Sequence, residues 1–313
     1  MVLANGDLVT VDKDSHADLN KALHGGGAHN FGIATNLTLK LHPYSGMWGG
    51  MHVVEEEHFD NVFAAYDQYT RDLSKDCRAH MIMDFWRNDG KMTAAQFMGY
   101  TAPVADPPIF DTFRQIPSVR STLRLADNSS LAEEMAEVTD CRGKRITWWT
   151  FCMEYDIDLL KAAFTLWTQM TEPYADHFRT AFDVNHITPA MRNKAAREDM
   201  GNVYGLEGPD EPLTNILLTG QCEHESDDAV VTEVLRSVAN AIEAEARKRG
   251  RGCSFKYMNY AHYEQDVIAA FGEKNKEFLN AVSARYDPEG VFQKLQPGAL
   301  KLELAAVKRA HKL

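Results

Sequence analysis

The alternation of apolar and polar residues predicts strands and helices along most of the chain. Side chains alternate with a period of two in six segments, which predicts strands over 47–54, 80–86, 92–99, 145–154, 180–187 and 213–221. Apolar residues recur at spacings of three and four after the first, fourth and sixth of these strands, which predicts three helices. The order of the elements predicts an α+β fold, an antiparallel sheet with helices on one face.

The ends of the chain have a different pattern. Residues 2–12 predict a short hairpin, residues 18–23 a helix and residues 33–41 a strand. Residues 255–260 predict a strand of polar and aromatic side chains, and a helix that ends at Asp287-Pro288-Glu289-Gly290 follows it. We therefore expect the ends to form a part distinct from the central sheet.

One long stretch, residues 100–144, lacks a clear period. It contains four prolines among many polar residues, so we expect a connection with short helical turns.

Composition and charge exclude several classes of protein. Of the 313 residues, 44% are hydrophobic and 25% are charged, values typical of a folded globular protein. The formal net charge of −12 and the absence of a basic run argue against a nucleic-acid partner. No stretch of 18 apolar residues and no signal peptide is found, so we expect no membrane partner and a cytoplasmic chain as written; a missing natural N-terminus would allow secretion.

Neither the cysteines nor the histidines form a recognisable metal motif. The five cysteines are widely spaced without a CxxC pair, which predicts mostly buried thiols, no disulfide framework and no zinc site. His52, Glu55 and His58 are better explained as the solvated start of a helix than as ligands, so we expect no metal.

A glycine-rich loop is the first candidate binding element. Gly25, Gly26 and Gly27 precede Asn30-Phe31-Gly32, and such a loop lets backbone N–H groups approach the phosphates of a nucleotide. A tight surface loop is the alternative. The HGGG sequence also occurs in lipases, but no GxSxG nucleophile motif is present, so we reject a hydrolase.

Polar faces on predicted strands are the second candidate. On 180–187, Asp183 and Asn185 share one face, opposite Val184 and His186; on 213–221, a similar polar face carries Asn215, Thr219 and Gln221. These faces could line a ligand pocket or simply be half-exposed.

The tyrosine-rich segment near the C-terminus is the third candidate binding element. On the predicted strand 255–260, Tyr257 and Asn259 alternate with Tyr260, and tyrosine hydroxyls suit proton transfer and cofactor binding. A tyrosine-rich core strand is the alternative.

Two segments together resemble a known family. ALHGGGAHNFGIATNLTLKLHP and YMNYAHYEQDVIAAFGEKNKEFLNAVSARYDPEGVFQKLQPG look like parts of berberine-bridge-enzyme-like FAD-linked oxidoreductases, in the vanillyl-alcohol-oxidase group, especially the fungal members. The resemblance implies a remnant of the second flavin-binding subdomain over 1–45, a substrate domain over 46–252 and a flavin-contacting strand and helix over 253–313.

The resemblance also implies roles for individual residues. Contacts with FAD would come from the loop and the terminal motif, namely Gly25, Gly26, Gly27, Asn30, Phe31, Gly32, Ile33 and Asn259. Tyr257, Tyr260, Asn185 and His186 are the candidate catalytic residues, and Asn185 falls where similar proteins often carry a glutamine. The implied reaction is hydride transfer from a small-molecule substrate to the flavin, in fungal secondary metabolism.

The chain departs from the family pattern at its start. It begins where the family's flavin domain is already half finished, so we expect a truncated oxidoreductase that lacks the first flavin-binding lobe and holds FAD weakly or not at all. A flavin-free cyclase, isomerase or dehydratase that uses the retained substrate pocket is the alternative. Unpaired strand edges also predict a homodimer or larger assembly.

Overall fold

The computed structural model describes residues 1–88, 90–197, 201–208, 210–296 and 300–303. They belong to two compact units. Unit 1 contains residues of Met1–Leu41, Pro189–Asp210 and Ser254–Leu313, and unit 2 contains residues of His42–Thr188 and Glu211–Cys253. The segment 189–210 therefore belongs with the two ends of the chain, whereas the boundaries expected from the sequence put it with the sheet.

Unit 2 is built on one antiparallel sheet. In its described residues the strand order is β4-β1-β3-β2-β7-β8-β6-β9, and β5 pairs with β1. The strands are β1 (Met47–Glu55), β2 (Ala79–Asn88), β3 (Lys91–Tyr100), β4 (Arg120–Ser121), β5 (Arg124–Ala126), β6 (Arg145–Glu154), β7 (Arg179–Ile187), β8 (Leu213–Cys222) and β9 (Gly252–Cys253). All six strands predicted over 47–221 are confirmed, and so is the antiparallel sheet.

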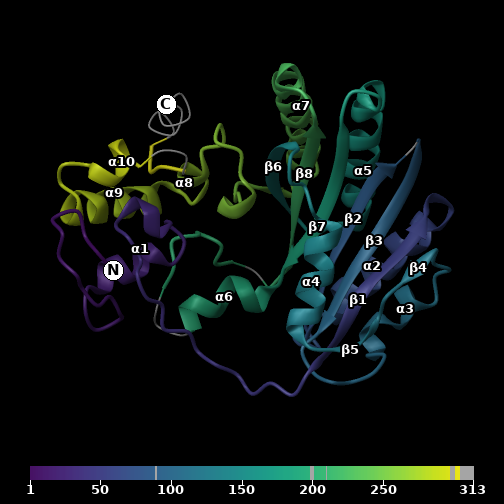
Figure 1. The fold of residues 1–313 in the computed structure, drawn as a ribbon, viewed down its shortest axis with the longest axis horizontal. Helices are drawn as coiled ribbons and strands as arrows, with labels where there is room; N and C mark the ends of the chain where they lie inside the picture. Colours follow the sequence, from purple (N-terminus) through teal and green to yellow (C-terminus); the bar gives the residue numbers. More distant parts are fainter. Residues whose placement is uncertain (89, 198–200, 209, 297–299, 304–313) are drawn as a thin grey trace. The chain divides into compact units, whose positions relative to one another are not determined.

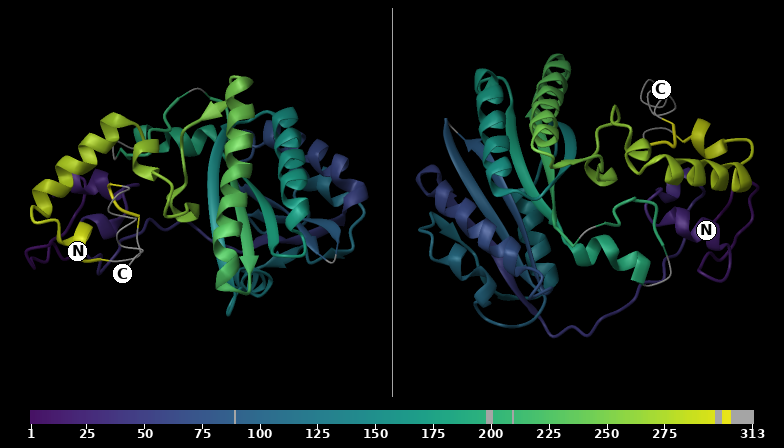
Figure 2. Two further views of the ribbon diagram at one scale, coloured as in Figure 1. Left: turned by 90° about the horizontal axis from the view of Figure 1, so that it is seen from above. Right: turned by 180° about the vertical axis from the view of Figure 1, so that it is seen from behind.

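Three long helices cover one face of this sheet (Figures 1 and 2). They are α2 (Phe59–Asp72), α5 (Ile157–Thr171) and α7 (Asp228–Lys248), and their apolar sides form one core with alternate residues of the strands. Asp156 caps α5 by accepting a hydrogen bond of 2.8 Å from the Leu159 N–H, which explains why the helix begins there. The predicted α+β architecture, with helices on one face, is confirmed.

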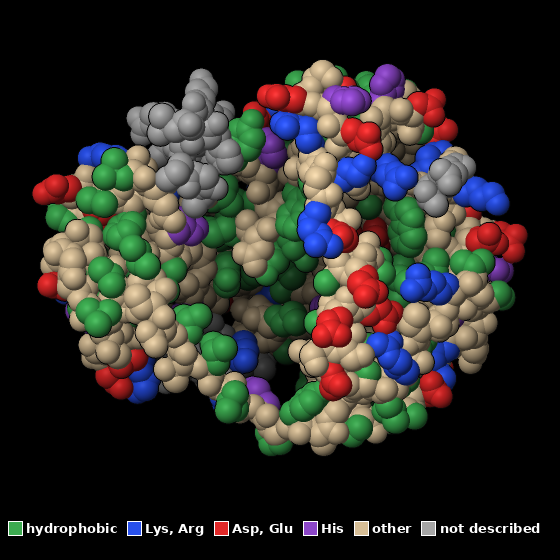
Figure 3. Space-filling view, in the orientation of Figure 1, with side chains coloured by type: hydrophobic (Ala, Val, Ile, Leu, Met, Phe, Trp, Pro, Cys, Tyr) green, Lys and Arg blue, Asp and Glu red, His purple; other side chains and the backbone are tan. Residues whose placement is uncertain are grey.

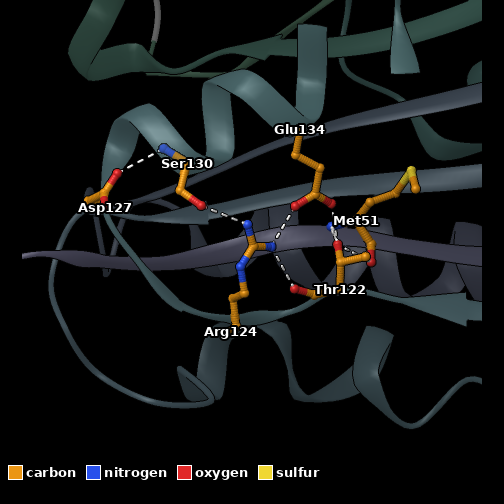
Figure 4. Close-up of polar contacts among 6 residues, drawn as sticks. All are labelled: Met51, Thr122, Arg124, Asp127, Ser130 and Glu134. Carbon is orange, nitrogen blue, oxygen red and sulfur yellow. Dashed lines mark hydrogen bonds and ion pairs between the residues drawn. The ribbon is translucent and has the colours of Figure 1, made fainter. Parts of the chain in front are cut away.

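A short helix lies against the opposite face at one edge. The helix α4 (Asn128–Val138) brings Leu131 within 3.1 Å of where a Cβ on Gly49 would lie. Figure 4 shows the polar contacts that hold α4: Asp127 accepts a hydrogen bond from the Ser130 N–H, and Arg124 contacts Ser130 and Glu134. The expectation of short helical turns over 100–144 was wrong here, because an 11-residue helix forms, held by the contact of Leu131 with the sheet and by these polar contacts.

Unit 1 consists of helices and helical turns in its described residues. They are α1 (Ala17–Leu23), the 3-10 turn η1 (Ala28–Asn30), α6 (Pro189–Arg197), the 3-10 turn η6 (Met258–Tyr260), α8 (Val267–Ala270), α9 (Glu273–Tyr286) and α10 (Val291–Lys294). Asp18 on α1 accepts hydrogen bonds from Arg285 at 2.7 Å and from Tyr286 at 2.8 Å on α9. The N-terminal and C-terminal parts of the chain are thus bound to each other.

Two predicted strands are absent from their expected positions in unit 1. Ile33 forms only an isolated bridge with Val2, residues 34–46 have no regular structure, and residues 258–260 form η6. The hairpin predicted over 2–12 is reduced to a bridge between Val2 and Leu8. A strand needs a partner for its N–H and C=O groups, and the described residues of unit 1 offer none beyond these bridges.

Among the described residues, no helix has the length and apolar character required to cross a membrane. Figure 3 shows acidic and basic side chains interspersed on the face of the chain drawn there.

The aromatic core of unit 2 gives a first prediction. Phe85 is fully buried and its ring lies 4.7 Å from that of Phe164 and 5.3 Å from that of Phe63. Phe85→Ala should lower the free energy of unfolding by about 3–5 kcal/mol, because it leaves a cavity among these rings. All five tryptophans lie in unit 2, so denaturant unfolding followed by tryptophan fluorescence reports this unit. Leu125→Ala, at a residue 53% exposed, is the control and should cost less than about 0.5 kcal/mol; equal losses would contradict the prediction.

Candidate functional site

The face of the sheet opposite α2, α5 and α7 carries polar residues at its centre, and we call it the second face. Its central row runs through Thr150 on β6, Leu217 on β8, Asp183 on β7, Asp84 on β2 and Ala95 on β3. Because side chains alternate along a strand, these residues all project from the same face. Two carboxyl groups therefore lie side by side at the middle of the sheet.

The carboxyl pair is enclosed largely by apolar neighbours. Asp84 and Asp183 are direct cross-strand partners, with Ala95 beside Asp84 and Leu217 beside Asp183. Both aspartates are half-buried, but the Oδ1 atom of Asp84 is wholly buried and has no hydrogen-bond partner among the described residues. Like charges directly opposite each other destabilise a sheet, so this arrangement is unfavourable for two carboxylates.

The pKa values of the pair follow from this environment. Burial raises the pKa of Asp84 to about 7. Burial, and then the neighbouring charge of Asp84, raise the pKa of Asp183 well above its ordinary value. Two adjacent carboxyl groups titrate as one system, and near neutral pH they hold a proton that isolated aspartates would have lost.

A pair of amides lies in the row beside the carboxyl pair. Asn185, the residue expected on the substrate side, is the cross-strand partner of Asn215. The Oδ1 atom of Asn215 accepts a hydrogen bond of 3.3 Å from Thr150. Trp86 projects from the same face on the other side of the carboxyl pair, opposite Ala181. The second face thus offers carboxyl, amide and aromatic groups together.

His186 lies on the other face of the sheet, away from Asn185. It is 4% exposed and its ring lies 5.4 Å from that of Tyr69 on α2. In the part of the chain that the structure describes, neither ring nitrogen has a hydrogen-bond partner. Burial, and then the nearby His80, lower the pKa of His186 to about 3. The structure does not bring these two candidates together, because one lies beneath the helices and the other on the second face.

The glycine loop of unit 1 is packed mainly against the protein itself. A Cβ on Gly25 would lie 2.9 Å from Val203, and one on Gly26 would lie 2.6 Å from the carbonyl oxygen of Ala22. Gly25 and Gly27 have φ values of 127° and 78°, which other residues rarely adopt. Their N–H groups donate to no acceptor in the described part of the chain, so these two amides fit contacts with a phosphate.

Three other loop residues have structural contacts. Asn30 is fully buried, donates to the Gly26 carbonyl at 2.8 Å and accepts a hydrogen bond from Gln293. Phe31 is also fully buried, and a Cβ on Gly32 would lie 2.6 Å from the carbonyl oxygen of Val2. The side chains of Asn30 and Phe31 offer no surface to a cofactor here, whereas Ile33 is 59% exposed.

The candidate site residues near the C-terminus lie on one turn. Tyr257 precedes η6 and Tyr260 ends it, and their rings lie 4.9 Å apart in an edge-to-face arrangement. Asn259 is exposed and donates a hydrogen bond of 2.9 Å to the Tyr257 hydroxyl. The structure therefore brings Tyr257, Asn259 and Tyr260 together, although on a turn and not on the predicted strand.

The carboxyl pair was not among the candidates that the sequence suggested. Asp183 was noted only as part of a polar face, and Asp84 was not considered. The sequence did contain one indication of the pair, an aspartate between Met83 and Phe85 in an otherwise apolar predicted strand. A charged residue inside such a strand requires an explanation. The pairing of β2 with β7, far apart in sequence, could not be deduced.

No family model matches the chain, but curated proteins do. It is 32% identical over 316 residues to FAD-dependent monooxygenase FUP4 of Fusarium proliferatum, covering 96% of this chain and 61% of that protein. It is 30% identical to FAD-dependent monooxygenase tpcD of Cochliobolus heterostrophus, with coverages of 96% and 61%, and 32% identical to FAD-dependent monooxygenase sdcF of Emericella nidulans, with coverages of 97% and 64%. The chain thus spans about three fifths of the length of these relatives.

Solved structures share the fold. The structure is similar to 6-hydroxy-D-nicotine oxidase from Arthrobacter nicotinovorans, with a TM-score of 0.73 at 15% identity, covering 93% of this chain and 63% of that one. It is similar to a variant of berberine bridge enzyme, with a TM-score of 0.69 at 11% identity and coverages of 96% and 64%. The VAO-type flavoprotein MtVAO713 from Myceliophthora thermophila gives 0.66 at 16% identity, with coverages of 93% and 55%. The fold is that of these flavoproteins.

The carboxyl pair predicts an unusual dependence of stability on pH. Because the folded protein binds protons here more tightly than the unfolded chain, the pair's contribution to stability should fall as the pH rises from about 4 to about 7. Asp183→Asn removes the contribution of one of the two carboxyls and leaves that of Asp84, so the difference in the free energy of unfolding between variant and wild type should grow in the variant's favour over this range.

Urea unfolding followed by tryptophan fluorescence at several pH values measures this difference. Buried histidines such as His186 make the free energy of unfolding rise with pH in both proteins. This contribution cancels when the value for wild type is subtracted from that for the variant. Asp176→Asn, at an exposed site, is the control and should leave the profile unchanged. A constant difference between Asp183→Asn and wild type at all pH values would show that the pair holds no extra proton.

Proposed function

We propose that this chain acts in an FAD-linked oxidoreductase of the berberine-bridge and vanillyl-alcohol-oxidase type, which oxidises a small organic molecule. The observation that carries the proposal is the agreement between two independent similarities. Fungal FAD-dependent monooxygenases match nearly the whole chain in sequence, and flavoproteins match it in fold. Both similarities extend over unit 1 and unit 2, since they cover at least 93% of the chain.

The residues of unit 1 fit part of the cofactor. Gly25 and Gly27 would hold a phosphate of FAD through their N–H groups, as these are not used within the described chain. Tyr257, Asn259 and Tyr260 would contact the cofactor or substrate through their hydroxyl and amide groups. Asn30 and Phe31 would act indirectly, by fixing the shape of the loop.

The second face of unit 2 would hold the substrate. FAD, when bound, supplies the acceptor for two electrons, and this chain's own residues orient the substrate and move its protons. Asn185, which is half-buried, can donate and accept hydrogen bonds, while Trp86 provides an aromatic surface. A small-molecule substrate fits this mixture of groups better than an acidic polymer, because the carboxyl pair adds negative charge to the face.

FAD binding tests the proposal directly. We expect the 313-residue chain to bind FAD saturably, measured as a rise in the fluorescence anisotropy of FAD on titration with protein. Gly25→Ala should weaken binding at least about tenfold, because the new Cβ would lie 2.9 Å from Val203 and the φ of 127° is strained for alanine. Gly272→Ala is the matched control: Gly272 also has a positive φ in unit 1, but nothing lies within 4 Å of its Cβ position.

The outcomes separate the two functional hypotheses. Saturable binding that Gly25→Ala weakens more than Gly272→Ala does would support the oxidoreductase. A folded chain that binds no FAD would contradict it and favour the flavin-free cyclase, isomerase or dehydratase, whose proton transfers need only the second face. Equal binding by both variants would show that the loop does not hold the cofactor.

A further inference from the structure

Two cysteines face each other at one edge of the sheet in unit 2. In the described residues β9 is the last strand of the sheet order, and it pairs with β6. Cys152 on β6 is the direct antiparallel partner of Cys253 on β9. Cys152 is two positions from Thr150, so both thiols project from the second face and lie side by side.

The spacing of the two strands suits a reversible disulfide. Directly opposite residues of an antiparallel pair have Cα atoms about 4.5–5.5 Å apart, within the range of about 4.4–6.8 Å that disulfides span. Their Cβ atoms lie about 4.5–5.5 Å apart, whereas a disulfide holds them at about 3.5–4.5 Å. The strands must therefore move slightly together when the bond forms, and a strained disulfide is easier to reduce.

The two thiols differ in exposure. Cys152 is 1% exposed, whereas Cys253 on the edge strand is partly exposed. A small oxidant can therefore reach Cys253 first, and Cys152 is in position to react with the oxidised sulfur. An accessible cysteine beside a second, resolving cysteine is typical of redox sensors.

The other three cysteines lie elsewhere in unit 2. Cys77 and Cys141 are exposed on loops, and Cys222 is buried in the core beneath the helices. The expectation of mostly buried thiols is therefore confirmed for Cys152 and Cys222 but wrong for Cys77 and Cys141. Among the register pairs of the described strands, Cys152–Cys253 alone joins two cysteines.

We propose that Cys152 and Cys253 form a reversible disulfide when the protein meets hydrogen peroxide or another small hydroperoxide, and that this bond fastens β9 to β6. β9 has two residues, and Ser254, the next residue, begins the last segment of unit 1. The bond therefore fixes the point at which the chain leaves the sheet, four residues before Tyr257.

The oxidation balances in atoms and electrons. The sulfur of Cys253 attacks one oxygen of hydrogen peroxide, the O–O bond breaks, and the products are a sulfenic acid and a water molecule. The sulfur of Cys152 then attacks the sulfenic sulfur, so that the S–S bond forms and the S–O bond breaks. The leaving hydroxide takes the proton of the Cys152 thiol and becomes a second water molecule. The two thiols lose two electrons, which the peroxide gains, and a small dithiol such as dithiothreitol returns them.

Mass spectrometry of the oxidised protein tests the formation of the bond. The reduced chain at low concentration receives hydrogen peroxide, the remaining thiols are alkylated, and the protein is digested with trypsin. Cleavage after lysine and arginine leaves Cys152 in the peptide 146–161 and Cys253 in the peptide 252–256. We expect these two peptides, joined by a disulfide, as the main linked product, and dithiothreitol should separate them.

Hydrogen exchange tests whether the bond fastens β9. The Glu154 N–H donates a hydrogen bond of 3.0 Å to the carbonyl oxygen of Arg251, directly before β9, so its exchange requires this edge of the sheet to open. Oxidation should slow the exchange of this amide at least about tenfold. The Thr122 N–H, which donates to the Met51 carbonyl on β1 at 2.9 Å, is the matched control and should exchange at an unchanged rate.

Variants remove one thiol at a time. Cys253→Ser and Cys152→Ala should each abolish the linked peptides and the slower exchange of the Glu154 amide. Cys141→Ser replaces an exposed thiol elsewhere and should retain both. Cys253→Ser changes a partly exposed side chain little in size, so it decides the result if Cys152→Ala fails to fold, which tryptophan fluorescence detects.

The chain unfolded in urea provides the reference for specificity. Its disulfides should be a mixture set by the separation of the cysteines along the chain, because no fold selects a pair. The same mixture from the folded protein, or no bond between Cys152 and Cys253, would overturn the proposal. Linked peptides without slower exchange of the Glu154 amide would also overturn it. The assays contain no flavin, so their outcome does not depend on the proposed function.

Discussion

The whole of unit 2 depends on the short ladder between β2 and β7. Among the described residues, four register pairs are the strand pairing between the two half-sheets, and the helices α2 and α5 bury the joined surface on one side. Phe85 and Phe182 lie opposite each other in this ladder and point into that core. Apolar burial on this side offsets the cost of the carboxyl pair on the other, since alternate residues of the same strands serve the two faces independently.

In unit 1, polar contacts between segments distant in sequence accompany the burial of apolar residues such as Leu19, Phe31 and Leu279. Asp287 accepts hydrogen bonds from the N–H groups of Val291 and Phe292, which directs the chain so that Gln293 reaches Asn30. Asn30 in turn binds the Gly26 carbonyl. The shape of the glycine loop therefore depends on the C-terminal segment, and buried hydrogen bonds of this kind are costly to break.

The sequence was sufficient to predict the elements of unit 2 because each has its own periodic apolar face. The strands around Phe85 and Phe151 and the helix around Trp167 followed from spacing alone. The strand predicted over 33–41 was wrong, although Leu37, Leu39 and Leu41 alternate with polar residues as in a strand. All three leucines are more than 70% exposed, and no strand pairs with them among the described residues. Local alternation indicates that a strand could form, but pairing decides whether it does.

The candidate site was less predictable for the same reason, since the contact of Asp84 with Asp183 exists only through the pairing of strands about 100 residues apart.

The row beside the carboxyl pair shows what the sheet would accept in its place. Asn185 and Asn215 occupy equivalent positions on neighbouring strands, and their amides carry no charge while still offering donors and acceptors. Amides at positions 84 and 183 would provide similar hydrogen bonds without repulsion at any pH. Carboxyl groups differ from amides in one property that matters here, which is that they gain and lose a proton near neutral pH once burial has raised the pKa of both. Carboxyl groups at these two positions therefore add a group that binds a proton near neutral pH, which amides would not do, and they add it at a cost in repulsion.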